Sequence, residues 1–151
     1  MIVINKNYYL AILNFEHMNE VHTLLQNLRR EYAGKSFDET DTESNPIEQF
    51  RKWFNEIIRS EVEDANAMIL ATSSRDNIPS ARVVLLKDFD ENGFVFFTNY
   101  NSRKGIELFL NPHATILFYW KELSRQIRIK GVVSKIKEIE SDEYFSSRPL
   151  N

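Results

Sequence analysis

Short segments rich in β-branched and aromatic residues make up the second half of the chain, and they constrain the fold more than any other feature. Five such segments follow Asn66, at residues 67–73, 80–89, 94–98, 114–120 and 125–136. The stretch Asp90-Glu-Asn-Gly93 is typical of a tight hairpin turn, because Asn-Gly accepts positive φ angles. Sequential strands with few helices predict a mainly β fold with flanking helices, of the α+β class, and favour a small β-barrel over alternating strands and helices.

Two helices are expected before the strands. From Met18, apolar residues recur at three- and four-residue steps, which predicts a helix that ends near Gly34. Asn45 is followed by Pro46 and Glu48, a typical helix start with a capping side chain, a proline in the first turn and a glutamate at the third position. The residues expected to be buried by this second helix are Ile47, Phe50, Phe54, Ile57 and Ile58.

Length and composition favour a single globular protein. The chain has 151 residues, of which 42% are hydrophobic and 27% charged. It has no cysteine, which excludes disulfides and thiol catalysis, and its net charge of −3 argues against nucleic acid as a partner. The first residues lack the basic start and cleavage site of a signal peptide, and no stretch is long enough to span a membrane, so we expect a cytoplasmic location. The expected divisions are an N-terminal extension at 1–17, a helical segment at 18–66 and a β domain at 67–151.

A phosphate site is predicted at the start of a third helix, which runs from the capping residue Ser102 to Leu110. The four glycines form no phosphate-binding loop, so a bound phosphate needs side chains and a helix terminus. Arg103 and Lys104 follow Ser102 and add positive charge to the N-terminal end of the helix dipole. The alternative interpretation is a capped surface helix whose basic residues are solvated.

Two strands carry polar residues that a ligand could use. Arg82 and Lys87 bracket an apolar segment, and their spacing of five places them on opposite faces of a regular strand. If both side chains reach one ligand, a β-bulge or a strong twist must re-aim one of them. Otherwise Lys87 must bind a ligand that lies beyond the end of the strand. Gln126 and Arg128 share one face of their strand, for which the polar face of an amphipathic strand is the simplest interpretation.

The protein offers no evident nucleophile, general base or metal site. The three histidines have no metal-binding spacing, and the serines lack the glycine context of a nucleophile elbow. No paired carboxylates stand out among the predicted strands. We therefore predict no catalytic side chain and no metal, as in proteins whose cofactor carries the chemistry.

Five segments, in this order, resemble the pyridoxamine 5'-phosphate oxidase family. Three of them fall within 45 residues: Arg82-Val-Val-Leu-Leu-Lys87, Phe97-Thr-Asn-Tyr-Asn-Ser-Arg-Lys104 and Arg125-Gln-Ile-Arg128. They are flanked by Leu28-Arg-Arg-Glu-Tyr32 and Tyr144-Phe-Ser-Ser-Arg-Pro149, the second of which lies on an expected last helix from Ser141. Phe97 departs from the tyrosine usual at that position in the family.

The resemblance implies an FMN-binding split β-barrel and a homodimer with FMN at the subunit interface. It also implies oxidation of pyridoxamine or pyridoxine 5'-phosphate by O2, in which a hydride passes from C4' of the substrate to flavin N5 and hydrogen peroxide is released. No nucleic acid or membrane partner is implied. The expected FMN contacts are Arg82, Val83, Val84, Leu85, Leu86, Lys87, Phe97, Thr98, Arg103, Lys104 and Gln126. The expected substrate contacts are Arg29, Arg30, Glu31, Tyr32, Lys87, Tyr144 and Arg148. For Lys87, the resemblance favours a ligand beyond the strand end.

The family's sequence continues past the position of Asn151, and the resemblance implies that the later residues complete the site. Three hypotheses remain open. The first is an oxidase of vitamin B6 metabolism whose C-terminal segment is truncated, and the second is another split-barrel flavoprotein, such as a flavin reductase. The third is a non-catalytic, truncated flavin-binding module.

Overall fold

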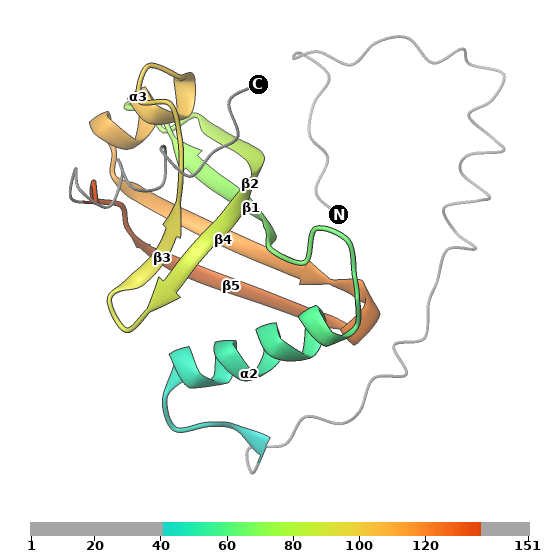
Figure 1. Ribbon diagram of the computed structural model, residues 1–151. Helices are drawn as coiled ribbons and strands as arrows, with labels where there is room; N and C mark the ends of the chain where they lie inside the picture. The colour runs from blue at the N-terminus through green and yellow to red at the C-terminus, as the bar shows by residue number, and fades with distance from the viewer. Residues whose placement is uncertain (1–40, 137–151) are drawn as a thin grey trace, which may run out of the picture. The chain divides into compact units, whose positions relative to one another are not determined.

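The computed structural model describes residues 41–136 of the chain. Its elements are α2 (Pro46–Arg59), β1 (Ala67–Ser73), β2 (Pro79–Asp90), β3 (Gly93–Phe96), α3 (Arg103–Leu110), β4 (His113–Trp120), a short 3-10 helix η3 (Lys121–Leu123) and β5 (Arg125–Val132). The five strands form one antiparallel sheet in the order β3-β2-β1-β4-β5. The sheet curls into a half-barrel, with α2 near one end and α3 near the other (Figure 1). The mainly β fold with flanking helices is thus confirmed.

The boundaries of the elements follow the sequence pattern closely, with two differences. β1 spans the predicted residues, and α3 begins after Ser102 and ends at Leu110, as expected. β3 ends at Phe96 instead of residue 98, and β5 ends at Val132 instead of residue 136. Because β3 is shorter than predicted, Phe97 and Thr98 lie in the connection that leads to α3.

The start of α2 depends on the side chain of Asn45. Its Oδ1 accepts a hydrogen bond of 2.7 Å from the backbone N–H of Ile47, which satisfies one of the donors that a helix start leaves without an intrahelical partner. Pro46 occupies the first turn, where its missing N–H costs nothing. The predicted cap is therefore confirmed.

An aromatic cluster joins α2 to the inner face of the sheet. Phe50 of α2 is 3% exposed, and its ring lies 4.8 Å from that of Phe89, 4.9 Å from that of Phe94 and 5.1 Å from that of Phe118. Trp120 closes the cluster at the end of β4 and donates from Nε1 to the carbonyl of Ala65. Pairs of this kind contribute beyond the area they bury, so this cluster is a main source of stability.

One predicted core residue of α2 is wrong. Ile57 is fully buried, but its neighbour Ile58 is 51% exposed. Ile58 lies about 100° further round the helix axis than Ile57, on the side of α2 that is turned away from the core. Trp53, which was not predicted, packs against the core instead.

The two faces of the sheet differ in what covers them. Residues directly opposite each other in paired strands share a face, so Leu70 and Arg82 lie on the inner face and Ile69 and Val83 on the outer one. Leu70 is fully buried, whereas Val83 is 66% exposed. Among the described residues, no helix is both long and apolar enough to cross a membrane.

Candidate functional site

The first turn of α3 is held against the connection that precedes it. Ser102 Oγ accepts from the backbone N–H of Gly105, and its own hydroxyl donates 2.6 Å to the carbonyl of Asn99. A Cβ built on Gly105 would lie 2.4 Å from the carbonyl oxygen of Tyr100 and 2.7 Å from that of Asn99. Only glycine permits this close approach, which fixes the helix start and the basic residues that follow it.

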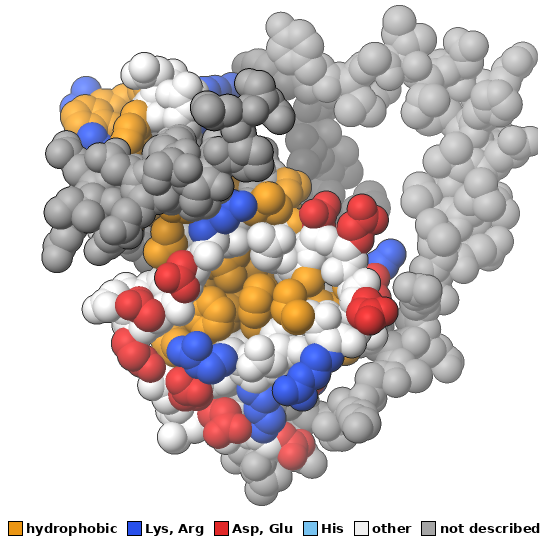
Figure 2. Space-filling model, in the orientation of Figure 1, with side chains coloured by type: hydrophobic (Ala, Val, Ile, Leu, Met, Phe, Trp, Pro, Cys, Tyr) orange, Lys and Arg blue, Asp and Glu red, His pale blue; other side chains and the backbone are white. Residues whose placement is uncertain are grey.

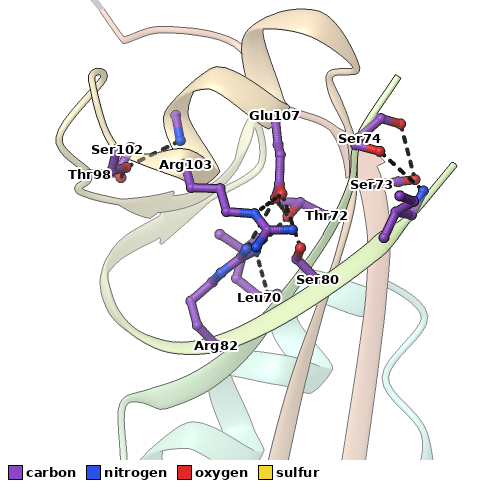
Figure 3. A network of polar contacts seen from close by, with 12 residues as sticks. Leu70, Thr72, Ser73, Ser74, Ser80, Arg82, Thr98, Ser102, Arg103 and Glu107 are labelled. Atoms are coloured by element: carbon purple, nitrogen blue, oxygen red, sulfur yellow. Dashed lines mark hydrogen bonds and ion pairs between the residues drawn. The ribbon is translucent and has the colours of Figure 1, made fainter. Parts of the chain in front are cut away.

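Beneath α3, a buried carboxylate organises a network of polar side chains (Figure 3). Glu107 is 5% exposed, and its Oε1 accepts from Ser80 Oγ at 3.0 Å and from Arg103 Nε at 2.9 Å. Its Oε2 accepts from the hydroxyl of Thr72 and from Arg82 Nη2 at 3.1 Å. Thr72, Ser80 and Arg82 come from the inner face of β1 and β2, so one carboxylate ties α3 to two strands.

These contacts keep Glu107 ionised. The hydrogen bond from Thr72 is the largest cause, and the bonds from Arg103, Ser80 and Arg82 add to it against the opposing effect of burial. Together they lower the pKa of Glu107 to about 2. The carboxylate is therefore negatively charged at neutral pH.

The arginines around Glu107 retain donors for a ligand. Arg82 donates through Nη1 to Thr72 and to the carbonyl of Leu70, and through Nη2 to Glu107, which leaves two of its five N–H groups. Among the described residues, Arg103 donates through Nε alone, so both of its terminal nitrogens remain, on a side chain that is 75% exposed. Within residues 41–136, no hydrogen bond or ion pair engages the ammonium group of Lys104.

The balance of charge at this end of the sheet suits a phosphate monoester. Arg82 and Arg103 pair with the carboxylate of Glu107, and Lys104 follows Arg103 in the first turn of α3, so these four residues carry a net charge of +2. A phosphate monoester carries about −1.5 to −2 near pH 7. The first N–H groups of α3 have no intrahelical acceptor and add two donors. The residues present therefore fit the phosphate of FMN.

β2 offers an unpaired edge next to this cluster. Residues 79–85 pair with β1 on one side, but pairing with β3 begins only at Leu86. Among the described residues, no strand occupies the second edge of 79–85, and Figure 1 shows the chain after β3 diverging from β2 towards α3. Alternate N–H and C=O groups of this stretch are thus available to a ligand.

The five residues after Arg82 play different parts. Val84 packs against the core and Leu86 is 4% exposed, so only their backbone groups can meet a ligand. Val83 and Leu85 are exposed on the outer face. The segment thus presents alternating apolar side chains outwards, as expected of a strand that borders a flat ring.

Lys87 occupies an irregularity inside β2 and not its end. The register with β3 shifts between Leu86 and Asp88, and the strand continues to Asp90. The structure thus contains a β-bulge, one of the options left open by the spacing of Arg82 and Lys87, and the ligand that the resemblance implies for Lys87 stays a prediction. Lys87 and Asp88 are both exposed, so the alternation of faces is broken there.

Gln126 lies on the opposite side of the sheet from the carboxylate network. It pairs with Tyr119, and it shares the outer face with Arg128, as predicted, whereas Ile127 and Ile129 pack inwards. The predicted FMN residues therefore form two groups, one at the start of α3 and one on the outer face, with β2 between them. Thr98 belongs to the first group, because its hydroxyl lies 3.5 Å from that of Ser102. Phe97, in the same connection, is half-buried.

Some predicted substrate residues fall outside the described part of the chain. These are Arg29, Arg30, Glu31, Tyr32, Tyr144 and Arg148. Within residues 41–136, no group of three or more His, Asp or Glu side chains could hold a metal ion.

Sequence reasoning missed Glu107, Thr72 and Ser80. A signal for Glu107 was present, because it lies four residues after Arg103 and next to the buried Leu108, on a short helix that can bury only one face. Thr72 and Ser80 carry no such signal. Their role depends on the register that places them opposite each other in β1 and β2.

Comparisons with known proteins agree with this geometry. The family model described as pyridoxamine 5'-phosphate oxidase matches residues 54–151. A pyridoxine/pyridoxamine 5'-phosphate oxidase of Ralstonia nicotianae is 56% identical over 85% of this chain and 60% of its own length, and one of Trichormus variabilis is 54% identical over 84% and 59%. The chain thus spans about three fifths of these relatives.

Solved structures show the same fold. PhzG from Burkholderia lata, in complex with tetrahydrophenazine-1-carboxylic acid, superposes with a TM-score of 0.72 and 31% identity over 78% of this chain and 59% of its own. An FMN-binding protein of Nostoc punctiforme, related to pyridoxamine 5'-phosphate oxidase, gives a TM-score of 0.53 and 22% identity over 67% of this chain and 55% of its own. The split-barrel fold expected from the resemblance is confirmed, and the chain belongs to the pyridoxamine 5'-phosphate oxidase family.

Proposed function

We propose that this chain binds FMN and serves the oxidation of pyridoxamine or pyridoxine 5'-phosphate by O2 to pyridoxal 5'-phosphate, with release of hydrogen peroxide. The observation that carries the proposal is the cationic cluster at the start of α3, with a net charge of +2 beside the unpaired edge of β2. The relatives named pyridoxine/pyridoxamine 5'-phosphate oxidase support the choice of substrate.

Each group of residues would have a separate task. Arg82, Arg103 and Lys104 would hold the FMN phosphate, with Thr98 beside them. Val83, Leu85 and Gln126 would meet the ring system from the outer face, where an amide can bond the ring's heteroatoms. Bound FMN would supply the redox chemistry, because it accepts two electrons from a substrate and passes them to O2.

The substrate phosphate would be bound by residues at two places in the chain. Lys87, in the bulge of β2, is one candidate. The others are Tyr144 and Arg148, and the segment Arg29 to Tyr32 would close over the site. A phosphorylated substrate would thus have several cationic partners, as a dianion requires.

Binding of FMN is tested by titrating the purified chain with FMN, riboflavin and FAD and following quenching of flavin fluorescence. We expect FMN to bind most tightly, because the site offers charged donors for a terminal phosphate and no glycine-rich loop for a dinucleotide. Equal affinity for FMN and riboflavin would contradict a phosphate site at α3.

The reaction is tested by adding pyridoxamine 5'-phosphate to the FMN-loaded protein in air and measuring pyridoxal 5'-phosphate and hydrogen peroxide. Unphosphorylated pyridoxamine is the matched control and should react far more slowly. The second substrate to test is tetrahydrophenazine-1-carboxylic acid, because the structure of PhzG was solved in complex with it. Turnover of the second substrate but not of pyridoxamine 5'-phosphate would contradict the proposed reaction and indicate a different flavin-dependent oxidation.

We also propose a homodimer formed through the outer face of the sheet. Ile69, Val83, Leu85 and Tyr119 are all more than a third exposed on that face. Figure 2, which shows one side of the molecule, illustrates that apolar side chains reach the surface among charged ones. Contiguous exposed apolar patches typically mark interaction sites.

The proposed interface predicts different effects for two exposed aromatic residues. Tyr119→Lys, on the outer face, should shift the protein towards monomer in sedimentation experiments. Phe109→Lys, at an 80% exposed position of α3, should not. The opposite result would move the interface to α3.

A further inference from the structure

The position of Glu107 is unusual for a short surface helix. Its side chain is 6% exposed, and it lies beside Leu108, which is 8% exposed. Burial of a carboxylate is costly unless donors surround it, and here four side chains donate to its two oxygens. An apolar residue of similar size would often give equal or greater stability at such a place. Stability of the fold alone therefore does not explain the choice of residue.

The effect of Glu107 on Arg103 is an effect on orientation. The side chain of Arg103 is 75% exposed and would otherwise sample many rotamers in solvent. Because Glu107 accepts from its Nε, the plane of the guanidinium is fixed and both terminal nitrogens stay available. Arg82 is held by the other carboxylate oxygen, so the two guanidinium groups converge from α3 and β2 on one point (Figure 3).

We propose that Glu107 is a positioning residue for the phosphate of the flavin: it orders Arg82 and Arg103 before the ligand binds. The inference rests on the proposed binding of FMN at this site. Glu107 is too buried to contact a ligand, so it acts through the two arginines. Its own negative charge opposes phosphate binding, which means that its contribution must come from geometry.

Two substitutions separate geometry from charge. Glu107→Asp keeps the charge, but it is one methylene shorter and cannot reach both arginines while it stays bonded to Thr72 and Ser80. Glu107→Gln keeps the length and removes the charge. The quantity to compare is the ratio of FMN affinity to riboflavin affinity, because loss of the fold would lower both affinities and leave the ratio unchanged.

We expect Glu107→Asp to lower this ratio about tenfold, because two arginine side chains must then be ordered during binding. In an Arg103→Ala background the same substitution should lower the ratio by about twofold or less, since the residue on which it acts is gone. Glu56→Asp is the matched control. Glu56 also pairs with an arginine, Arg125, but it lies on α2, and its substitution should leave the ratio unchanged.

Three results decide the matter. An unchanged ratio in Glu107→Asp, or an equal loss with and without Arg103, would overturn the positioning role and leave FMN binding intact. A wild-type chain that does not prefer FMN to riboflavin would instead remove the proposed site. If Glu107→Asp does not fold, Arg103→Lys gives the answer: a lysine held by Glu107 has no second pair of donors, so the ratio should again fall about tenfold. A ratio equal to that of the wild type would overturn the proposal.

Discussion

α2 and α3 pack on the same inner face of the sheet with opposite chemistry. Beneath α2, the ring of Phe50 contacts the rings of Phe89, Phe94 and Phe118. Beneath α3, the carboxylate of Glu107 takes the central place and is surrounded by hydroxyl and guanidinium groups. Apolar packing is the larger source of stability. A buried charge contributes little net stability, because the free energy of its desolvation offsets the gain from its ion pairs and hydrogen bonds. We therefore expect the α2 end of the half-barrel to contribute more to stability, and the α3 end to carry the binding proposed above.

The largest effect is expected from the binding end. Replacing Arg103 and Lys104 together by alanine should weaken FMN binding by about 3 kcal/mol or more, because each charge-assisted contact contributes about 1.5–3 kcal/mol. Riboflavin, which lacks the phosphate, is the control ligand and should bind with nearly unchanged affinity. Fluorescence titration measures both affinities. An unchanged FMN affinity would favour the alternative interpretation, in which Arg103 and Lys104 are solvated surface residues.

Phe50→Ala tests the stability end. We expect it to lower the free energy of unfolding by about 3–5 kcal/mol, because it opens a cavity at the centre of the aromatic cluster. Phe109→Ala, at an 80% exposed position, is the control and should change it by about 0.5 kcal/mol or less. Urea unfolding measures both variants. A comparable loss at Phe109 would show that the aromatic cluster is not the main source of stability.

Gly105→Ala should change both the stability of the fold and the binding of FMN. The added methyl group would meet the carbonyl oxygens of Tyr100 and Asn99, so the start of α3 must move. We expect a loss of about 1–3 kcal/mol in the free energy of unfolding, and weaker FMN binding as well. Gly131→Ala is the matched control, because nothing lies within 4 Å of its added Cβ. Equal effects at the two glycines would argue against a constrained helix start.

The smallest effect is expected in the pH dependence of the unfolding free energy, through the ionisation of Glu107. The pKa of Glu107 is lowered from 4.5 to about 2 in the folded chain, so its ionisation stabilises the fold above pH 4.5, and this contribution is lost as the pH falls towards 2. The difference in unfolding free energy between the wild type and Glu107→Gln should therefore be constant above pH 4.5 and shrink below it. Urea unfolding at several pH values gives this difference. A difference that grows on acidification would reverse the sign assigned to this group.

Much of the fold could be predicted because its signals are local. The Asn45 cap, the Asp90–Gly93 turn and the extent of β1 each depend on a few adjacent residues. The cationic residues at the start of α3 were predicted for the same reason. The exposure of Ile58 and the bulge at Lys87 depend on packing and on register between strands, which no single segment encodes.

The centre of the site was out of reach for a related reason. Glu107 meets Thr72 and Ser80 only after β1 and β2 pair and α3 folds across them, at sequence separations of 35 and 27 residues. The basic residues at the start of α3 could be named from the sequence, but the buried carboxylate that pairs with Arg82 and Arg103 could not.

The unpaired edge of β2 also bears on how the protein behaves before it meets its cofactor. A row of open N–H and C=O groups is a template on which a strand of another molecule can add, and proteins usually cover or shorten such edges. The second edge of residues 79–85 stays exposed unless a strand or a ligand occupies it. A flavin seated there would act as a cap against aggregation, so supplying riboflavin during expression should raise the yield of dispersed protein.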